Sequence, residues 1–253
     1  MVSALSTRDL AKAFGRNVAV AGLNLEVPRA SCFGLIGPNG SGKTTTMRMC
    51  AGLLRPDRGG VLVDGIDVWA DPVEARRRVG VVPDPLLLFE RLTGIEQLVH
   101  IGLLRNLGPI ETETRSRGLL EVLGLTEAAD EAIGDYSHGM RKKLSLATAL
   151  LHRPALLLLD EPFEGVDPVS AMTVRQVLDR YREAGGTVVV SSHVMEVLQK
   201  VCDHVAIIRR GEVLAAGAVE ELSGNSTLED AFISIVGEAP TDAALLDWLD
   251  APA

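Results

Sequence analysis

The feature that most restricts the fold of this 253-residue chain is a glycine-rich octapeptide, Gly37 to Thr44, which fits the pattern G-x-x-x-x-G-K-[ST]. A β-rich run from Ser31 to Ile36 precedes it, and a helical pattern from about Lys43 to Leu54 follows it. Between a strand and a helix, such glycines let the backbone curl so that several N–H groups point at phosphate oxygens. The N-terminus of the helix adds its positive end. The octapeptide therefore predicts a phosphate-binding loop within an α/β fold.

The side chains of this loop predict that the ligand is a nucleoside triphosphate. We expect the Lys43 ammonium group to reach the β- and γ-phosphates and the Thr44 hydroxyl to ligate Mg²⁺. The expected nucleotide-binding residues of the loop are Gly37, Pro38, Asn39, Gly40, Ser41, Gly42, Lys43, Thr44 and Thr45.

An apolar run from Ala155 to Leu159 ends in two acids, Asp160 and Glu161. Such a run is typical of a strand buried in a parallel sheet, whose carboxyl end faces the ligand crevice. We expect Asp160 to hold Mg²⁺ through water and Glu161 to orient or deprotonate the attacking water. Acids at a strand end also serve as turn formers, but the phosphate loop upstream favours the catalytic interpretation.

A histidine, His193, follows a second predicted strand, Thr187 to Ser192. A lone histidine is more often structural than catalytic, but its place at a strand end favours contact with the γ-phosphate. We therefore expect Glu161, His193 and Lys43 to be the catalytic residues.

Three patterns predict how the chain is organised. Strands alternate with helices in the second half, which favours a mostly parallel sheet flanked by helices. Near the N-terminus, Leu5 to Phe14, Val18 to Val27 and Gly60 to Val63 indicate an antiparallel β layer. Between about residues 84 and 153 the strand signals vanish and helical runs dominate, which predicts an inserted α-helical subdomain.

Net charge is −9 and the isoelectric point is about 5.1, which disfavours a nucleic-acid binder because such a protein needs basic surface to neutralise phosphates. Basic clusters at residues 76–78 and 141–143 are expected to be solvated helix faces. No apolar stretch approaches the roughly 20 residues that cross a membrane, and no secretory signal is visible at Met1 to Leu10. Three cysteines without metal-ligand spacing predict buried, reduced thiols. We therefore expect a cytosolic protein.

Over roughly Leu5 to Leu222 the sequence resembles the ATP-binding-cassette (ABC) ATPases. The most diagnostic stretch is Tyr136 to Arg141, which is similar to the family signature. In that family the signature binds the γ-phosphate held by the opposite subunit. The resemblance therefore implies a P-loop ATPase core, ATP and Mg²⁺ as cofactors, a second cassette as partner, and Ser137 and Gly139 as nucleotide ligands. It also implies an ATPase domain over residues 1–222 and a C-terminal helical extension and tail over 223–253.

The resemblance assigns further roles and shows two departures. Phe14 falls where the family stacks an aromatic ring on adenine, although a core or turn phenylalanine is the alternative. His138 stands where the family usually has glycine, so its side chain must point away from the phosphate or add a donor to it. Asp84 stands where the family usually has a glutamine that touches Mg²⁺ and the attacking water. We hypothesise that Asp84 keeps the metal role.

The resemblance also implies integral membrane transporter subunits as partners, which would hold this chain at the cytoplasmic face of the membrane. Residues 84–96 would lie at the contact, although the apolar run Leu86 to Phe89 within them could equally be core. The sequences around Gly139 and Gly165 resemble exporter cassettes encoded separately from their membrane subunits, for drug, antibiotic or lipid export. The alternatives are an ABC ATPase that acts on a soluble assembly and an ATP-binding switch with little turnover.

Overall fold

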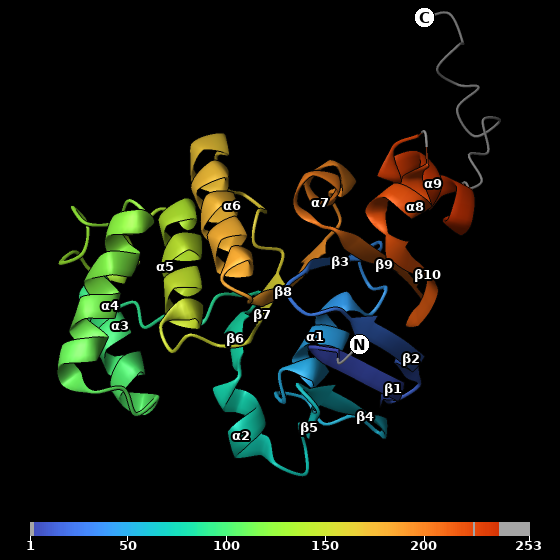
Figure 1. Cartoon of the computed structure of the whole chain (residues 1–253), viewed down its shortest axis with the longest axis horizontal. Coiled ribbons are helices and arrows are strands. Elements are labelled where there is room, and N and C mark those ends of the chain that lie inside the picture. The colour runs from blue at the N-terminus through green and yellow to red at the C-terminus, as the bar shows by residue number, and fades with distance from the viewer. Residues whose placement is uncertain (1–2, 225, 238–253) are drawn as a thin grey trace, which may run out of the picture.

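The computed structural model describes residues 3–224 and 226–237, and a six-stranded sheet forms its centre (Figure 1). The strand order is β10-β9-β3-β8-β7-β6, and β10 alone runs antiparallel to its neighbour, so the predicted mostly parallel sheet is confirmed. The strands are β3 (Cys32–Ile36), β6 (Val79–Val82), β7 (Leu156–Asp160), β8 (Thr187–Ser192), β9 (His204–Arg209) and β10 (Glu212–Ala218).

A second, antiparallel sheet has the order β2-β1-β4-β5, which confirms the predicted N-terminal β layer. Its strands are β1 (Leu5–Phe14), β2 (Asn17–Val27), β4 (Arg58–Val63) and β5 (Ile66–Asp67). Helix α1 (Lys43–Cys50) contacts strands of both sheets and so joins the two layers.

The predicted helical segment contains three α-helices, which Figure 1 shows grouped beyond the β6 edge of the parallel sheet. They are α3 (Gly94–Leu104), α4 (Pro109–Val122) and α5 (His138–Leu150), with a 3₁₀ turn at Ile133–Asp135. The start of α3 is fixed by a capping box, in which Thr93 and Glu96 each accept a hydrogen bond from the other's backbone N–H. This arrangement confirms the inserted helical region.

The remaining helices are α2 (Pro72–Arg77), α6 (Pro168–Glu183), α7 (Met195–Val201), α8 (Val219–Ser223) and α9 (Leu228–Val236). The sequence patterns did not predict α2, α8, β5, β6 or β10, and the helix expected from Lys43 to Leu54 ends four residues earlier, at Cys50. Helix α9 lies within the expected C-terminal helical extension. The domain boundary expected at residue 222 falls inside α8. Residues 238–253, which make up most of the expected tail, lie outside the described residues.

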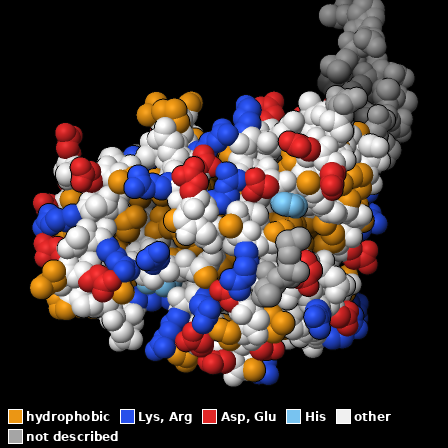
Figure 2. All heavy atoms as spheres, viewed as in Figure 1, with side chains coloured by type: hydrophobic (Ala, Val, Ile, Leu, Met, Phe, Trp, Pro, Cys, Tyr) orange, Lys and Arg blue, Asp and Glu red, His pale blue; other side chains and the backbone are white. Residues whose placement is uncertain are grey.

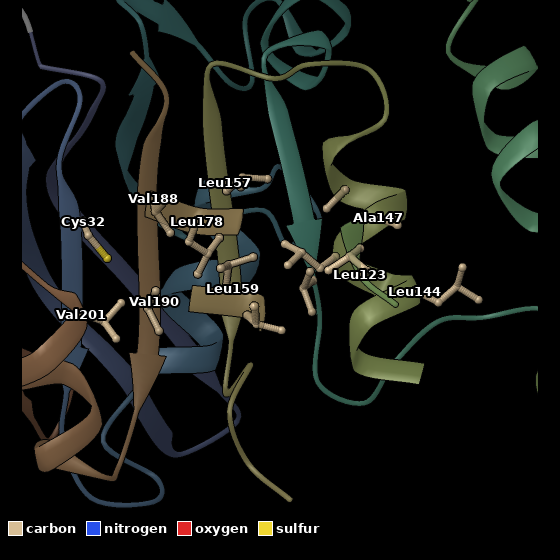
Figure 3. Packing of buried hydrophobic residues seen from close by; sticks show 14 of the residues in the cluster. Cys32, Leu123, Leu144, Ala147, Leu157, Leu159, Leu178, Val188, Val190 and Val201 are labelled. Carbon is tan, nitrogen blue, oxygen red and sulfur yellow. The ribbon is translucent and has the colours of Figure 1, made fainter. Parts of the chain in front are cut away.

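Successive residues of the central strands pack alternately into two different hydrophobic cores. In β7, Leu157 and Leu159 pack into one cluster with α3–α6, and Leu156 and Leu158 pack into the other, between the sheets. Figure 3 shows the first cluster, where Leu157 and Leu159 lie beside residues of β8 and α6. This alternation explains why the sequence of a strand covered on both faces is continuously apolar. The three cysteines are buried and free, as predicted.

Charges of both signs are interspersed over the face shown in Figure 2, and hydrophobic side chains gather there in a hollow. A groove of about 530 Å³ lies between α4, α5 and α6. The basic cluster at 141–143 is not simply a solvated helix face, because Lys142 is only 3% exposed. Within the described residues, no helix combines the length and hydrophobicity that a membrane crossing requires.

Candidate nucleotide site at the carboxyl ends of the parallel strands

Strands β3, β8 and β7 are neighbours, and their carboxyl ends open onto one pocket of about 420 Å³. Because parallel strands end at the same edge of a sheet, segments far apart in the sequence meet here. The pocket is lined by Phe14, Asn17, Ala19, residues 39–45, Asp84, Glu161, Glu164 and His193. The structure therefore brings residues 39–45 of the predicted loop together with Glu161, His193 and Asp84, whereas Gly37, Pro38 and Asp160 are not among the lining residues.

The phosphate loop runs from the end of β3 to the start of α1 and depends on two glycines. Gly42 has φ of +107°, and a Cβ there would lie 2.5 Å from the Ala19 carbonyl oxygen. A Cβ on Gly37 would lie 2.2 Å from the Ile208 carbonyl oxygen, so neither position admits a side chain without movement of the backbone. No side chain caps the N-terminus of α1. Its first N–H groups therefore face the pocket as an anion site.

The Lys43 side chain lies folded against the phosphate loop. Its Nζ donates hydrogen bonds to the carbonyl oxygens of Gly37 at 2.6 Å and Pro38 at 3.3 Å. Burial lowers the pKa of Lys43, and the nearby carboxylates of Glu161 and Asp160 partly oppose that effect. The ammonium group is thus held within the loop, where a phosphate would meet it.

A hydrogen-bond network connects the two acids to the loop and to β8. The Thr44 hydroxyl donates to Asp160 Oδ1 at 3.3 Å, and the Ser191 hydroxyl donates to the same oxygen. The Ser191 hydroxyl also accepts the backbone N–H of Glu161 at 3.1 Å. One serine side chain therefore fixes the positions of both acids relative to each other.

Glu161 and His193 form a pair at the mouth of the pocket. His193 Nδ1 lies 3.2 Å from Glu161 Oε2, and the Glu161 side chain is 12% exposed while that of His193 is 40% exposed. The carboxylate is thus shielded on one side and open to the pocket on the other, which suits a group that handles a water molecule.

Phe14 and Asp84 both line the pocket. Phe14 ends β1, its ring is half exposed, and Lys12 Nζ lies 5.8 Å from the ring centroid. A ring this exposed is not part of either core, so the alternative of a core phenylalanine is excluded. Asp84 follows β6, and its carbonyl oxygen accepts a hydrogen bond from Arg48. Its carboxylate oxygens are chemically suited to Mg²⁺.

Ser137 and Gly139 do not line the pocket of the same chain. Ser137 is the N-cap of α5, and its hydroxyl accepts the Met140 N–H at 3.2 Å. The sequence left open whether the His138 side chain points toward the phosphate or away from it. In the structure its Nε2 lies 3.2 Å from the Glu164 carbonyl oxygen, and its ring packs against Gly165. The side chain is therefore engaged with a neighbouring loop.

Sequence reasoning missed Asn17, Ala19, Glu164 and Ser191. Asn17 and Ala19 belong to β2, whose place beside the loop depends on how the two sheets pack. Ser191 is paired with Asp160 in the parallel register of β7 and β8, which a sequence motif does not encode.

Comparison with known proteins agrees with this geometry. Residues 20–164 match the protein-family model described as ABC transporter. The chain is 35% identical to the linearmycin resistance ATP-binding protein of Bacillus subtilis (strain 168), over 93% of this chain and 76% of that protein. It is 38% identical to the daunorubicin/doxorubicin resistance ATP-binding protein of Streptomyces peucetius, over 88% of this chain and 67% of that protein.

A solved structure of an ATP-binding subunit of an ABC transporter superposes with a TM-score of 0.86 at 26% identity. The similarity covers 92% of this chain and 100% of that one. The region matched by the family model contains the phosphate loop and the acid pair, and the solved structure shares the fold. The chain therefore belongs to the ABC transporter family and is an ATP-binding cassette, an ATPase.

Proposed function

We propose that this cassette energises an exporter through separate membrane subunits, with each ATP held between two cassettes. One observation carries the proposal of a shared site. A single chain gathers residues 39–45 of the phosphate loop, Glu161 and His193 in one pocket, while Ser137 and Gly139 lie outside it at the N-terminus of α5. A helix N-terminus outside the chain's own pocket is suited to the γ-phosphate bound by a second cassette.

Within the pocket, each residue has a proposed role that its position supports. The loop N–H groups and Lys43 hold the phosphates, and the exposed Phe14 ring stacks on the base. Glu161 accepts a proton from the attacking water, whose oxygen bonds to the γ-phosphorus as the bond to the ADP oxygen breaks. His193 orients the Glu161 carboxylate and reaches the γ-phosphate. These roles use the burial and spacing described above.

The donor set fits Mg²⁺, which is a hard cation that binds oxygen. The hydroxyl of Thr44, which lines the pocket, lies within hydrogen-bond distance of the carboxylate of Asp160, and Asp84 adds a third oxygen donor in the pocket lining. When bound, Mg²⁺ would supply charge neutralisation on the β- and γ-phosphates. We propose that Thr44, Asp160 and Asp84 are its protein contacts.

The proposed surface for the membrane subunits lies between β6 and α3. Leu86 and Leu88 pack on the core, whereas Leu87 is 73% exposed and Phe89 is 52% exposed, so the run is part core and part surface. A groove of about 380 Å³ lies along the neighbouring face of α3. Exposed apolar side chains beside a groove are typical of a protein contact site. Through such subunits the chain would lie at the cytoplasmic face of the membrane.

The relatives support export as the direction of transport. Two of them are named as resistance proteins for linearmycin and for daunorubicin and doxorubicin, and another is a Nod factor export ATP-binding protein. We propose a drug, antibiotic or lipid-like substrate on this basis. We also propose residues 1–222 as the ATPase domain, with its helical subdomain at about 84–153, and residues 223–253 as an extension.

Glu161→Gln tests the proposed roles within the site. Glutamine keeps the shape of the side chain but cannot accept a proton, so we expect turnover to fall by about a hundredfold or more while MgATP still binds. With hydrolysis blocked, MgATP should double the molar mass in light scattering. Glu121→Gln, an exposed site on α4, is the matched control and should behave as wild type. Unchanged turnover in Glu161→Gln would refute the general-base role, and a persistent monomer would refute the shared site.

A further inference from the structure

One face of α5 holds the backbone of the turn that follows β7. Lys142 Nζ donates a hydrogen bond to the Glu161 carbonyl oxygen at 2.7 Å, and the Lys142 residue is only 3% exposed. One helical turn earlier, His138 Nε2 lies 3.2 Å from the Glu164 carbonyl oxygen. Because residues four apart share a helix face, both side chains reach the same turn. The contact between α5 and the turn is thus made by two side chains bonding to two carbonyls.

The backbone of Glu161 is held from both sides. Its φ is +46°, a left-handed conformation that costs roughly 1 kcal/mol or more for a residue with a side chain. Its N–H donates to the hydroxyl and the carbonyl oxygen of Ser191, on β8. Its carbonyl accepts from Lys142, on α5. Since a strained conformation persists only where its surroundings enforce it, these bonds help to fix the direction of the Glu161 carboxylate.

The chemistry at position 142 argues for a donor rather than for packing alone. An apolar side chain of similar length would fill the same space without the cost of burying an ammonium group. The buried amine instead bonds to the carbonyl of the residue whose carboxylate faces His193. Lys143, the next residue, points elsewhere, with its Nζ near Gly124.

We propose that Lys142, assisted by His138, is a positioning residue that aligns Glu161 for water activation. Since Ser137 and Gly139, the proposed contacts to the second cassette, lie at the start of α5, this hydrogen bond makes the alignment of Glu161 depend on the position of that helix. A shift of α5 when the cassettes close would then change the position of the Glu161 carboxylate in the same chain. The inference rests on the proposed role of Glu161 as general base.

Lys142→Met tests the inference because it keeps the length of the side chain and removes the donor. In single-turnover ATP hydrolysis we expect the rate constant to fall by about tenfold or more, since small misplacements of catalytic groups carry losses of this order. The KM for ATP should stay within about twofold, because Lys142 does not line the pocket. Lys142→Arg, which keeps a donor, should recover most of the rate, and Lys143→Met should match wild type.

The Glu161→Gln background separates positioning from a general structural role. If Lys142 acts through Glu161, adding Lys142→Met to Glu161→Gln should change the residual rate by less than about twofold. The double variant should also still form the MgATP dimer. A wild-type rate in Lys142→Met, or an equal loss in both backgrounds, would overturn the inference.

Two further results distinguish a failure of this inference from misfolding of the variant and from a failure of the proposed general-base role. If Lys142→Met does not fold, the comparison of Lys142→Arg with Lys142→Gln decides the matter: equal rates would overturn the inference, and a higher rate with arginine would support it. If Glu161→Gln alone turned over ATP at the wild-type rate, the general-base role would be wrong and this inference would fall with it. A slow Glu161→Gln beside an unaffected Lys142→Met would reject only the inference.

Discussion

At the scale of single residues, the Ser191 hydroxyl is the point at which the two acids of the site meet. It donates to Asp160 and accepts from the Glu161 backbone. We expect Ser191→Ala to lower kcat by about tenfold, because it removes the hydrogen bond to Asp160 and one of the two that hold the Glu161 N–H, each bond being worth about 1 kcal/mol. The Mg²⁺ concentration for half-maximal activity should rise as Asp160 loses its donor. Both quantities are measured in one Mg²⁺ titration of ATPase activity.

A control separates this effect from the loss of any buried hydroxyl. Ser223 lies in α8, far along the chain, and its hydroxyl donates to the Val219 carbonyl at 2.8 Å. Ser223→Ala should leave the Mg²⁺ titration at its wild-type position. A Ser191→Ala protein with a wild-type titration would show that the network is not needed for catalysis.

The sequence predicted those site residues whose roles are encoded in contiguous motifs. Lys43, Asp160, Glu161 and His193 could be placed because each directly follows a strand or glycine-rich turn that is visible in the sequence. Ser191 could not be predicted as a site residue, since its contact with Asp160 requires that β8 lie next to β7 in a particular register. The strand order is a property of the packed sheet, and the sequence does not state it.

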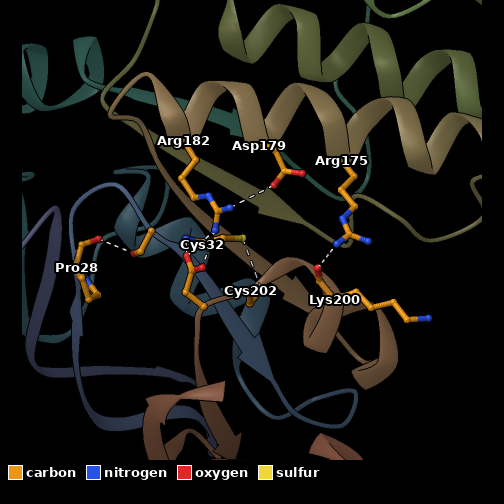
Figure 4. Close-up of polar contacts among 9 residues, drawn as sticks. Pro28, Cys32, Arg175, Asp179, Arg182, Lys200 and Cys202 are labelled. Carbon is orange, nitrogen blue, oxygen red and sulfur yellow. Dashed lines mark hydrogen bonds and ion pairs between the residues drawn. The ribbon is translucent and has the colours of Figure 1, made fainter. Parts of the chain in front are cut away.

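At the scale of elements, an ion pair ties α6 to the start of β3 (Figure 4). Arg182 NH1 lies 2.7 and 2.8 Å from the two carboxylate oxygens of Asp203, one of which also accepts the Cys32 N–H at 2.8 Å. The Cys32 backbone is buried, so its donor needs that acceptor. The pair therefore joins helix, strand and the segment after α7.

Asp203→Ala and Asp203→Asn should differ in stability for this reason. The alanine variant leaves the Cys32 N–H unpaired and should lose about 1–3 kcal/mol of unfolding free energy. The asparagine variant keeps an acceptor and loses only a partly exposed charge, which is worth about 1 kcal/mol or less. Urea denaturation of both variants measures the difference. Equal losses would mean that the ion pair, and not the backbone acceptor, stabilises this junction.

The junction between α5 and β6 contains a histidine that should make stability depend on pH. His152 Nε2 donates to the Val79 carbonyl at 3.1 Å. Burial, and secondarily the positive charge of Arg105, lowers the pKa of His152 to about 4. Between pH 6.5 and 4 the unfolded chain binds a proton that the folded chain does not. Stability should therefore be lost as pH falls through this window, by roughly 3 kcal/mol at 1.4 kcal/mol per pKa unit.

His152→Gln isolates this contribution, because glutamine can still donate to Val79 but does not titrate. We expect its unfolding free energy to fall less steeply than that of wild type between pH 6.5 and 4. His100→Gln, at an exposed position on α3, should retain the wild-type slope. If the slopes of His152→Gln and wild type coincide, the histidine is not responsible for the pH dependence.

Elements with strong local signals were predicted, and short exposed ones were not. The continuous apolar run of β7 and the proline at the start of α6 each mark their element. Strand β10 alternates exposed and half-buried residues at the sheet edge, and α8 has five residues, so neither presents a long periodic pattern. These elements form because β9 and α9 give them something to pack against.

At the scale of the whole molecule, the nucleotide pocket and the two proposed partner contacts are formed by different segments of the chain. The phosphate pocket is formed at the carboxyl ends of the parallel strands, the proposed anion site lies at the start of α5, and the groove near Phe89 runs along α3. The fold class followed from the alternation of strands and helices. The sequence could not predict which surfaces meet a partner. The exposure of Leu87 and Phe89 is set by tertiary packing and not by their hydrophobicity.

The central claim, that this ATPase works for a membrane exporter, is tested most directly by capture of its partner. Tagged Glu161→Gln protein, held in the ATP-bound state with MgATP, is purified from detergent-solubilised native membranes and its companions are identified by mass spectrometry. The account predicts a multi-span membrane protein in stoichiometric amount. Recovery of ribosomal or DNA-associated proteins in its place, or of no membrane protein at all, would contradict it.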